Sequence, residues 1–205
     1  IILSLLYVVA IVAESMTAAL AAGRRSMDWV GVCLLGCITA LGGGSVRDIL
    51  LDHHPLTWVA HPHYLVITTV AALATIALAR VMHRLHHLFL FLDAVGLVVF
   101  TIIGCNVALE LNLPLMIVII SGMITGCVGG VLRDILCNDI PLLFRSELYA
   151  SVSIVTGLLY VAGLHFGLNH ELVMSIALLC GLTLRMLALR FKWNMPKFIY
   201  NRDEH

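Results

Sequence analysis

Two short stretches combine glycines with an Arg-Asp pair inside otherwise apolar sequence: GGGSVRD at 42–48 and GGVLRD at 129–134. Consecutive glycines tolerate unusual backbone angles, so both stretches predict a kink or an unwound turn in a helix. A break of this kind frees backbone carbonyl groups, which can coordinate a cation if they face a water-filled cavity. The alternative is that the glycines only let two helices pack closely. The glycines concerned are Gly42, Gly43, Gly44, Gly129 and Gly130.

The arginine of each pair follows the glycines by about one helical turn. In a membrane interior an ionised Arg costs on the order of 2.5–3.5 kcal/mol, so Arg47 and Arg133 need carboxylate partners, for charge pairing or for gating. Adjacent residues on a helix do not face each other. We therefore expect Arg47 to pair with Asp134 across the two stretches. By the same reasoning Arg133 pairs with Asp48. The alternative is that the two arginines extend to opposite membrane surfaces.

Five other polar residues fall within apolar runs and are candidates for a pathway. Glu14, in AIVAESMTAAL, could line it or bind a proton, or make a packed hydrogen bond. Asp93, in LFLFLDAVGLVVF, is expected near the cytoplasmic end of a helix, where capping is the alternative. Ser45, Thr39 and Thr125 could supply hydroxyl oxygens, although bonding to the helix backbone is their commoner use.

Histidines and cysteines raise the question of a metal site. HHPLTWVAHPH holds four histidines in one loop, but their spacing matches no defined zinc motif, so metal binding and pH sensitivity both remain open. Cys33 and Cys37 are four residues apart and could share a helix face; a buried, small hydrophobic role is the commoner one. We expect no metal site and no cofactor. The loop histidines are His53, His54, His61 and His63.

The composition places these residues in a lipid bilayer. Of 205 residues, 61% are hydrophobic and 12% are charged, and the mean hydropathy is +1.03. Soluble domains carry about 45–50% apolar and about 25% charged residues. The apolar runs are long and do not alternate with polar residues, which excludes barrel strands and favours helices. We predict an all-α, polytopic membrane protein.

Seven spans of about 20 residues, the length that a bilayer core requires, account for the apolar runs. With seven spans, the loops that carry Lys and Arg all fall on one side, and the opposite loops carry His and Glu. The positive-inside rule then places the N-terminus outside and the C-terminus in the cytoplasm. Only Arg47 and Arg133 are left away from the basic side. The predicted spans are 2–22, 29–51, 64–82, 88–109, 114–137, 148–168 and 171–191.

The two glycine stretches belong to a longer repeat. GCITALGGGSVRDILLDHHPLTW (36–58) aligns without a gap with GMITGCVGGVLRDILCNDIPLLF (122–144). The copies lie in the second and fifth spans, and an odd offset makes them run in opposite directions through the membrane. Inverted repeats with glycine-interrupted segments are typical of transport proteins. We predict one membrane domain, 1–198, with repeats at about 1–86 and 87–170, a seventh helix at about 171–191, and a cytoplasmic tail at 199–205.

Several function classes find no support in the sequence. It contains no Walker loop, no GxSxG and no HExxH, and no soluble domain that could carry such chemistry. We therefore predict that the protein is not an enzyme. Nothing indicates a nucleic-acid partner or a soluble protein partner.

GGGSVRDILL, GGVLRDIL, the paired three-helix repeats, the seventh helix and RSELYA resemble a bacterial inner-membrane family, the glycine-transporter-domain proteins, related to trimeric intracellular cation (TRIC) channels. Val128 stands where a third glycine would complete the second motif, so we expect a shallower kink there. The resemblance implies a homotrimer in contact with membrane lipids, including bound lipid. It also implies a pore in each protomer, lined by the second and fifth spans, that conducts monovalent cations, mainly potassium. Arg47 and Arg133 would influence gating.

The leading hypothesis is thus a potassium-permeable channel. The alternative is a secondary transporter of a small solute such as glycine, because both classes use inverted repeats with interrupted helices. A third hypothesis, from a different class, is a membrane scaffold that conducts nothing.

Overall fold

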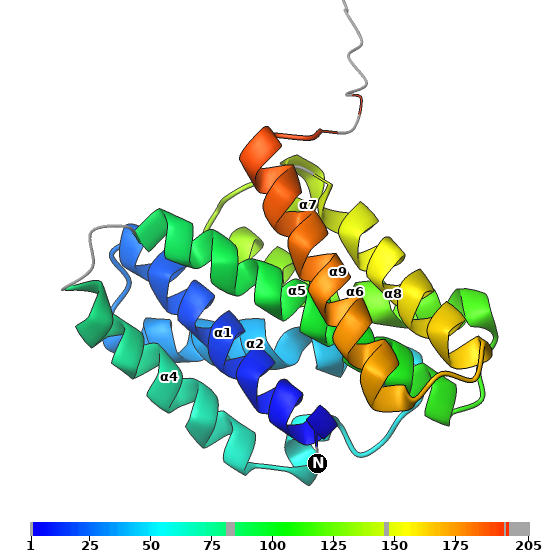
Figure 1. Ribbon diagram of the computed structural model, residues 1–205. Helices are drawn as coiled ribbons and strands as arrows, with labels where there is room; N and C mark the ends of the chain where they lie inside the picture. The colour runs from blue at the N-terminus through cyan, green and yellow to red at the C-terminus, as the bar shows by residue number, and fades with distance from the viewer. Residues whose placement is uncertain (1, 81–84, 146–147, 195, 197–205) are drawn as a thin grey trace, which may run out of the picture.

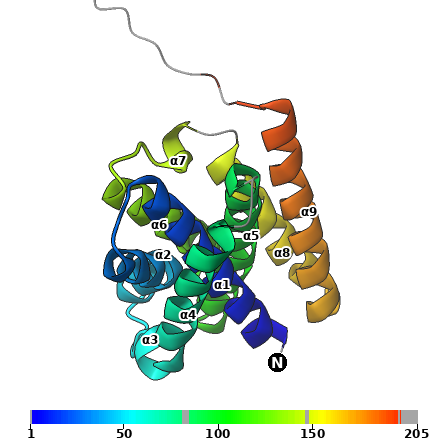
Figure 2. The ribbon, with the colours of Figure 1, turned by 90° about the vertical axis from the view of Figure 1, so that its left-hand side faces the viewer.

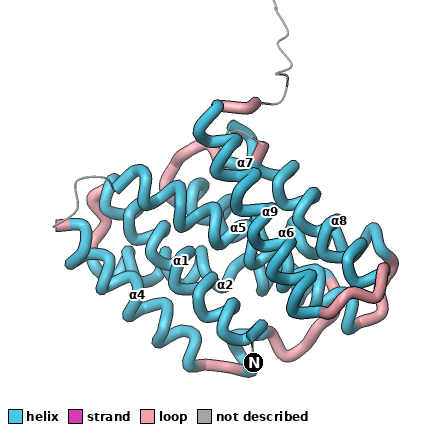
Figure 3. Tube along the Cα trace, viewed as in Figure 1, coloured by secondary structure: helices cyan, strands magenta, loops and turns pink. Residues whose placement is uncertain are grey.

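The computed structural model describes residues 2–80, 85–145, 148–194 and 196, and within them all regular structure is helical (Figure 3). This confirms the all-α prediction. The predicted tail at 199–205, with Arg202, and the basic residues Arg84 and Lys197 lie outside the described residues. The helices are α1 (Ile2–Arg24), α2 (Trp29–Leu50), α3 (Thr57–Ala60), α4 (His63–Ala79), α5 (Leu85–Glu110), α6 (Leu115–Leu136), α7 (Leu142–Arg145), α8 (Tyr149–His165) and α9 (His170–Phe191).

Five of the described helices, α1, α2, α5, α6 and α9, are long and apolar enough to cross a bilayer. Helices α4 and α8 occupy the predicted third and sixth spans but have 17 residues each. At ~1.5 Å per residue each is roughly 26 Å long, slightly less than the ~30 Å of a hydrocarbon core. The chain is therefore a helical membrane protein with five strong spans and two shorter apolar helices.

The two halves of the chain repeat the same order of helices. A long helix, α2 or α6, ends in a turn, and a four-residue helix, α3 or α7, leads into a 17-residue helix, α4 or α8. Each turn contains a residue in the left-handed region, Asp52 with φ 53° and Asn138 with φ 56°. The sequence repeat at 36–58 and 122–144 therefore corresponds to a repeat of local structure.

Helix α5 forms the centre of the bundle (Figure 1) and packs against α1, α6, α8 and α9. In its most apolar 18-residue window, 72% of the residues are buried, against 33–50% in the other four long helices. Figure 2 shows α9 at one edge, beside α5 and α8, and α2 at the opposite edge. Apolar side chains at α5 positions bind the two repeats into one unit, because burying apolar surface is the main favourable contribution to packing.

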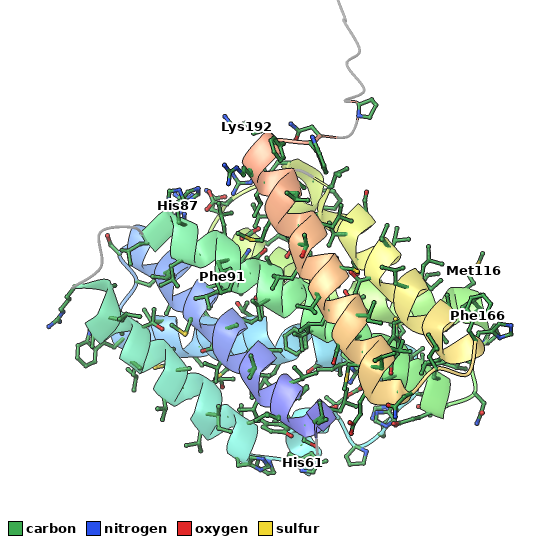
Figure 4. All side chains as sticks on the ribbon, in the orientation of Figure 1. His61, His87, Phe91, Met116, Phe166 and Lys192 are labelled. Atoms are coloured by element: carbon green, nitrogen blue, oxygen red, sulfur yellow. The ribbon has the colours of Figure 1, made fainter. Side chains whose placement is uncertain are left out.

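The ends of the helices differ in charge. Basic ends of α1, α7 and α9 and the histidines of α5 meet at one hollow, which Lys192 and His87 border, whereas His61 lies at the opposite end of the bundle (Figure 4). Large apolar side chains such as Leu34, Val66 and Leu179 are exposed on the flanks between the two ends. A belt of exposed apolar residues between polar ends fits a bilayer rather than water.

Candidate functional site

Helices α2 and α6 cross in direct backbone contact at Gly43 and Gly129. A Cβ atom on Gly43 would fall inside the contact distance of the Thr125 carbonyl oxygen and 3.3 Å from the Gly129 nitrogen, and a Cβ atom on Gly129 would overlap the Thr39 carbonyl oxygen. Thr39 of α2 faces Gly129 of α6, and Gly43, one turn later on α2, faces Thr125, one turn earlier on α6. The two helices therefore cross with opposite polarity, which supports the inverted orientation of the repeats.

Both helices remain continuous through their glycines: α2 spans Trp29–Leu50 and α6 spans Leu115–Leu136. Of the two predicted forms, the unwound turn is therefore wrong, and no backbone carbonyls are freed there for a cation. The kink, and its shallower form expected from Val128, stay predictions. Close packing, the alternative, is what Gly43 and Gly129 provide. In an apolar environment an intact helix keeps its backbone hydrogen bonds, and small residues let two such helices approach.

Past the crossing on α2, Arg47 pairs with its neighbour Asp48. Its Nε and Nη2 atoms donate to Asp48 Oδ1 at 2.9 and 2.6 Å. The other carboxylate oxygen of Asp48 accepts from the backbone N–H and the hydroxyl of Thr57, at 3.0 and 2.9 Å, and His53 Nδ1 lies 3.1 Å from Oδ1. Asp48 thus joins the end of α2 to the first residue of α3.

The same design recurs on α6. Arg133 Nε donates to Asp134 Oδ1 at 2.9 Å, and Asp134 Oδ2 accepts from the backbone N–H of Leu142, the first residue of α7, at 2.8 Å. Each aspartate therefore neutralises the arginine beside it and also satisfies an amide at the start of a short helix, where helix amides lack partners of their own.

We call each arginine together with the side chains around it the Arg47 centre and the Arg133 centre. The Arg133 centre holds further acidic groups that the Arg47 centre lacks. Arg133 Nη1 donates to Asp93 Oδ1 of α5 at 2.7 Å and to Thr17 Oγ1 of α1 at 3.0 Å, and lies 3.8 Å from Glu14 Oε2. Arg133 also stacks on Phe89, 4.6 Å from the ring centre, and Arg24 lies 4.7 Å from the same ring centre. Glu14 and Asp93, two of the pathway candidates, are thus brought together with Arg133.

The predicted pairing between the two stretches is wrong. Arg47 lies four residues past Gly43 and Asp134 five residues past Gly129, in opposite directions, so about nine residues, or roughly 13 Å of helix, separate them. The long Arg side chain instead turns back to the adjacent carboxylate. The alternative of extension to the membrane surfaces is also wrong, since Arg47 and Arg133 are 1% and 0% exposed.

The remaining candidates make mostly local contacts. Ser45 Oγ donates to the Leu41 carbonyl and Thr125 Oγ1 to the Ser121 carbonyl, both at 2.7 Å, which is the backbone bonding named as the alternative. The buried Thr39 hydroxyl has no hydrogen-bond partner among the described residues. Gly42 lies against Leu132, while Gly44 and Gly130 face their own arginines: a Cβ atom there would lie 3.7 Å from Arg47 Nη2 and 3.5 Å from Arg133 Nη2.

Sequence reasoning missed three residues of the Arg133 centre. Thr17 lies three residues after Glu14, and Phe89 four residues before Asp93, so helical spacing would have placed each on the same face as its acid. Tyr149 is the third: its buried hydroxyl has no partner among the described residues, and Arg185 stacks on its ring at 4.9 Å. Tyr149 is the first residue of α8 and lies outside the aligned stretch at 122–144, so no spacing in that stretch indicates it.

The question of a metal site gains no support from the part of the chain that the structure describes. There, no group of three or more His, Cys, Asp or Glu side chains could hold a metal ion. Cys33 and Cys37 are free thiols, as are the other four cysteines. Of the loop histidines, His53 contacts Asp48 and His54 lies 3.5 Å from Asp52.

Comparison with known proteins identifies a family and several relatives that this chain resembles. The family model described as "Glycine transporter" matches residues 4–80 and 90–165. The UPF0126 inner membrane protein YadS of Escherichia coli (strain K12) is 37% identical over 191 residues, 92% of each chain. A UPF0126 membrane protein of Vibrio cholerae is 36% identical over 199 residues, 95% of this chain and 83% of the relative.

Solved structures share the fold. The TRIC trimeric intracellular cation channel orthologue from Rhodobacter sphaeroides superimposes with a TM-score of 0.90 and 32% identity, over 93% of this chain and 98% of that one. A second structure, which addresses conductance through TRIC cation channels, gives a TM-score of 0.88 and 32% identity, over 98% of this chain and 99% of the other.

Proposed function

The chain belongs to the glycine transporter family of helical membrane proteins, and from that premise we propose that it is a monovalent cation channel. The observation that carries the proposal is the structural likeness to TRIC cation channels across nearly the whole of both chains, at 32% identity. None of these relatives is named as an enzyme, which agrees with a transport role.

In this proposal the ion path of each protomer runs beside α2 and α6. The contact at Gly43 and Gly129 leaves no space between the two backbones, so this conformation is closed at the crossing, and conduction requires the helices to separate or rotate. Arg47 and Arg133 would repel a cation if they were unpaired. Their pairing with Asp48 and Asp134 offsets that repulsion, so that movement of either arginine would change the barrier.

The proposal extends to selectivity and assembly. We propose potassium as the main permeant ion, a homotrimer with one pore in each protomer, and location in the bacterial inner membrane. Helices α4 and α8 complete seven spans; their 17 residues cross the bilayer with slight local thinning. The basic end of the bundle faces the cytoplasm, which places the N-terminus outside and the C-terminus inside.

Bound lipid belongs to the same proposal. A hollow of about 780 Å³ at the basic end combines four cationic side chains with an apolar floor, which suits the phosphate and upper acyl chains of an anionic lipid. Replacing Arg145 and Arg190 together by Gln should reduce the phosphatidylglycerol retained on the purified protein several-fold in native mass spectrometry. Arg80→Gln, at a basic position outside the hollow, should retain it; equal retention by both variants would refute the lipid site. The cationic residues are Arg24, Arg145, Arg190 and Lys192.

Planar bilayers with asymmetric KCl test the channel function. We expect step-like currents that reverse near the potassium equilibrium potential, because a pore conducts without alternating access. Replacing potassium by sodium then measures the selectivity. A secondary transporter of a small solute, which the family's description favours, would instead give saturable glycine uptake into liposomes without unitary currents. If the correctly inserted protein passes neither ions nor glycine, the scaffold hypothesis replaces both.

A further inference from the structure

One buried acid of the Arg133 centre lies farther from the arginine than the two aspartates do. Glu14 is 2% exposed, and its Oε2 atom lies 3.8 Å from Arg133 Nη1, beyond hydrogen-bond distance. Arg133 already donates to Asp93 at 2.7 Å and to Asp134 at 2.9 Å. One guanidinium therefore faces three carboxyl groups. A third ionised carboxylate would leave uncompensated negative charge in a buried site, which is costly.

The hydrogen bonds of Thr17 show where a proton fits. The Thr17 hydroxyl donates its single hydrogen to the Glu14 backbone carbonyl at 2.7 Å and accepts from Arg133 Nη1 at 3.0 Å. It also lies 3.3 Å from Glu14 Oε2. The single hydrogen of the hydroxyl can serve either the carbonyl at 2.7 Å or Oε2 at 3.3 Å, and the shorter distance favours the carbonyl. An ionised Oε2 would then face another acceptor. A proton on Oε2 turns this contact into a hydrogen bond and satisfies the hydroxyl completely.

We propose that Glu14 is a proton-binding site, which holds one proton on Oε2 and donates it to Thr17 Oγ1 beside Arg133. The proposal does not depend on which solute the protein carries. The proton keeps Glu14 neutral while Arg133 pairs with the two aspartates. Loss of the proton turns Glu14 into a competing partner for Arg133, so occupancy of the site determines the partners of the arginine on α6.

Among the described residues, Arg133 is the cation within 4 Å of the Glu14 carboxyl group. Helix α5 contributes Asp93, α6 contributes Arg133 and Asp134, and α8 contributes the Tyr149 hydroxyl. Helix α9 contributes Arg185, which stacks on the Tyr149 ring. On α2, Arg47 pairs with Asp48 and Cys37 contacts Thr68 of α4; His63 and Tyr64 lie at the start of α4.

The other repeat offers an internal comparison. The repeat offset is 86 residues, since Asp48 corresponds to Asp134, and α1 and α5 end at the matching residues Arg24 and Glu110. At this offset Glu14 corresponds to Phe100, and Asp93 to Tyr7, and these two aromatic rings contact each other with centroids 5.9 Å apart. The Arg47 centre therefore has aromatic residues where the Arg133 centre has two acids, so the extra acids are particular to the second centre.

Infrared spectroscopy of the full-length protein in lipid at neutral pH tests the site. We expect the carbonyl band of a protonated carboxyl group, shifted by deuterium exchange, and its loss in Glu14→Gln. Glu110→Gln, which changes an exposed acid that accepts from Asn106, should keep the band. Absence of the band from the wild-type protein, or its persistence in Glu14→Gln, would overturn the proposal.

Thermal unfolding of the same proteins separates a proton site from an ion pair. Gln resembles a protonated Glu and can donate to Thr17, so Glu14→Gln should change the midpoint by less than about 2 °C. Asp93→Asn removes an ionised partner of Arg133 and should lower it by at least about 6 °C. If Glu14→Gln destabilises the protein as much as Asp93→Asn, Glu14 is an ionised partner of Arg133 and the proposal is wrong.

Discussion

Replacing Arg133 with Met is expected to lower the free energy of unfolding by about 3–5 kcal/mol, the cost of breaking a buried ion pair from one side. The change leaves Asp93 and Asp134 buried without a cation, and it removes the contact of the guanidinium with the Phe89 ring. Arg47→Met should cost less, because Asp48 is the single acid left behind and keeps two hydrogen bonds from Thr57. Thermal or denaturant unfolding in detergent measures the difference.

A compensating variant separates charge from packing in this prediction. Asp93→Asn and Asp134→Asn added to Arg133→Met remove the stranded charges, so the triple variant should recover part of the loss despite carrying more changes. If Arg133→Met proves as stable as Arg47→Met, or if the triple variant is the least stable, then the acids around Arg133 are not held by its charge.

The sequence was sufficient for the features that depend on composition and periodicity. Long apolar runs predicted the helices, and a gap-free repeat predicted two antiparallel copies of one local structure. The short helix after each Arg-Asp pair was not predicted. These features follow from hydrophobic burial and backbone hydrogen bonding, which act along a single segment.

The partners of the charged residues could not be predicted in the same way. Pairing of Arg47 with Asp48 depends on how a long side chain turns back at the end of a helix, and the prediction from Cβ directions failed there. The Arg133 centre draws residues from several different helices, and their packing is not encoded in any local pattern. Consecutive glycines also have two physical uses, a break or a close contact, and only the position of α6 against α2 decides between them.

Gly43→Ala is expected to destabilise the protein by about 1–3 kcal/mol, because its Cβ atom would overlap the backbone of α6, which cannot move aside as a flexible side chain would. Gly44→Ala is the matched control on the same helix. Its Cβ atom would lie 3.7 Å from Arg47 Nη2, an ordinary contact, so better helix propensity should leave it as stable as the wild type or up to about 1 kcal/mol more stable. Unfolding in detergent measures the stability of the two variants. Equal stability would show that the backbone contact at Gly43 does not contribute to the packing of α2 against α6.

The same pair of variants connects the crossing to conduction. If the contact of α2 with α6 closes the path, a methyl group at Gly43 forces the helices apart and should raise the open probability of single channels, whereas Gly44→Ala should not. Gly129→Ala acts on the same contact from the other helix, so the double variant with Gly43→Ala should add less than the sum of the two effects. Unchanged gating in a destabilised Gly43→Ala protein would mean that the crossing is a structural contact and that the ion path lies elsewhere. A rise in open probability that follows the loss of stability would identify the glycine crossing as the gate.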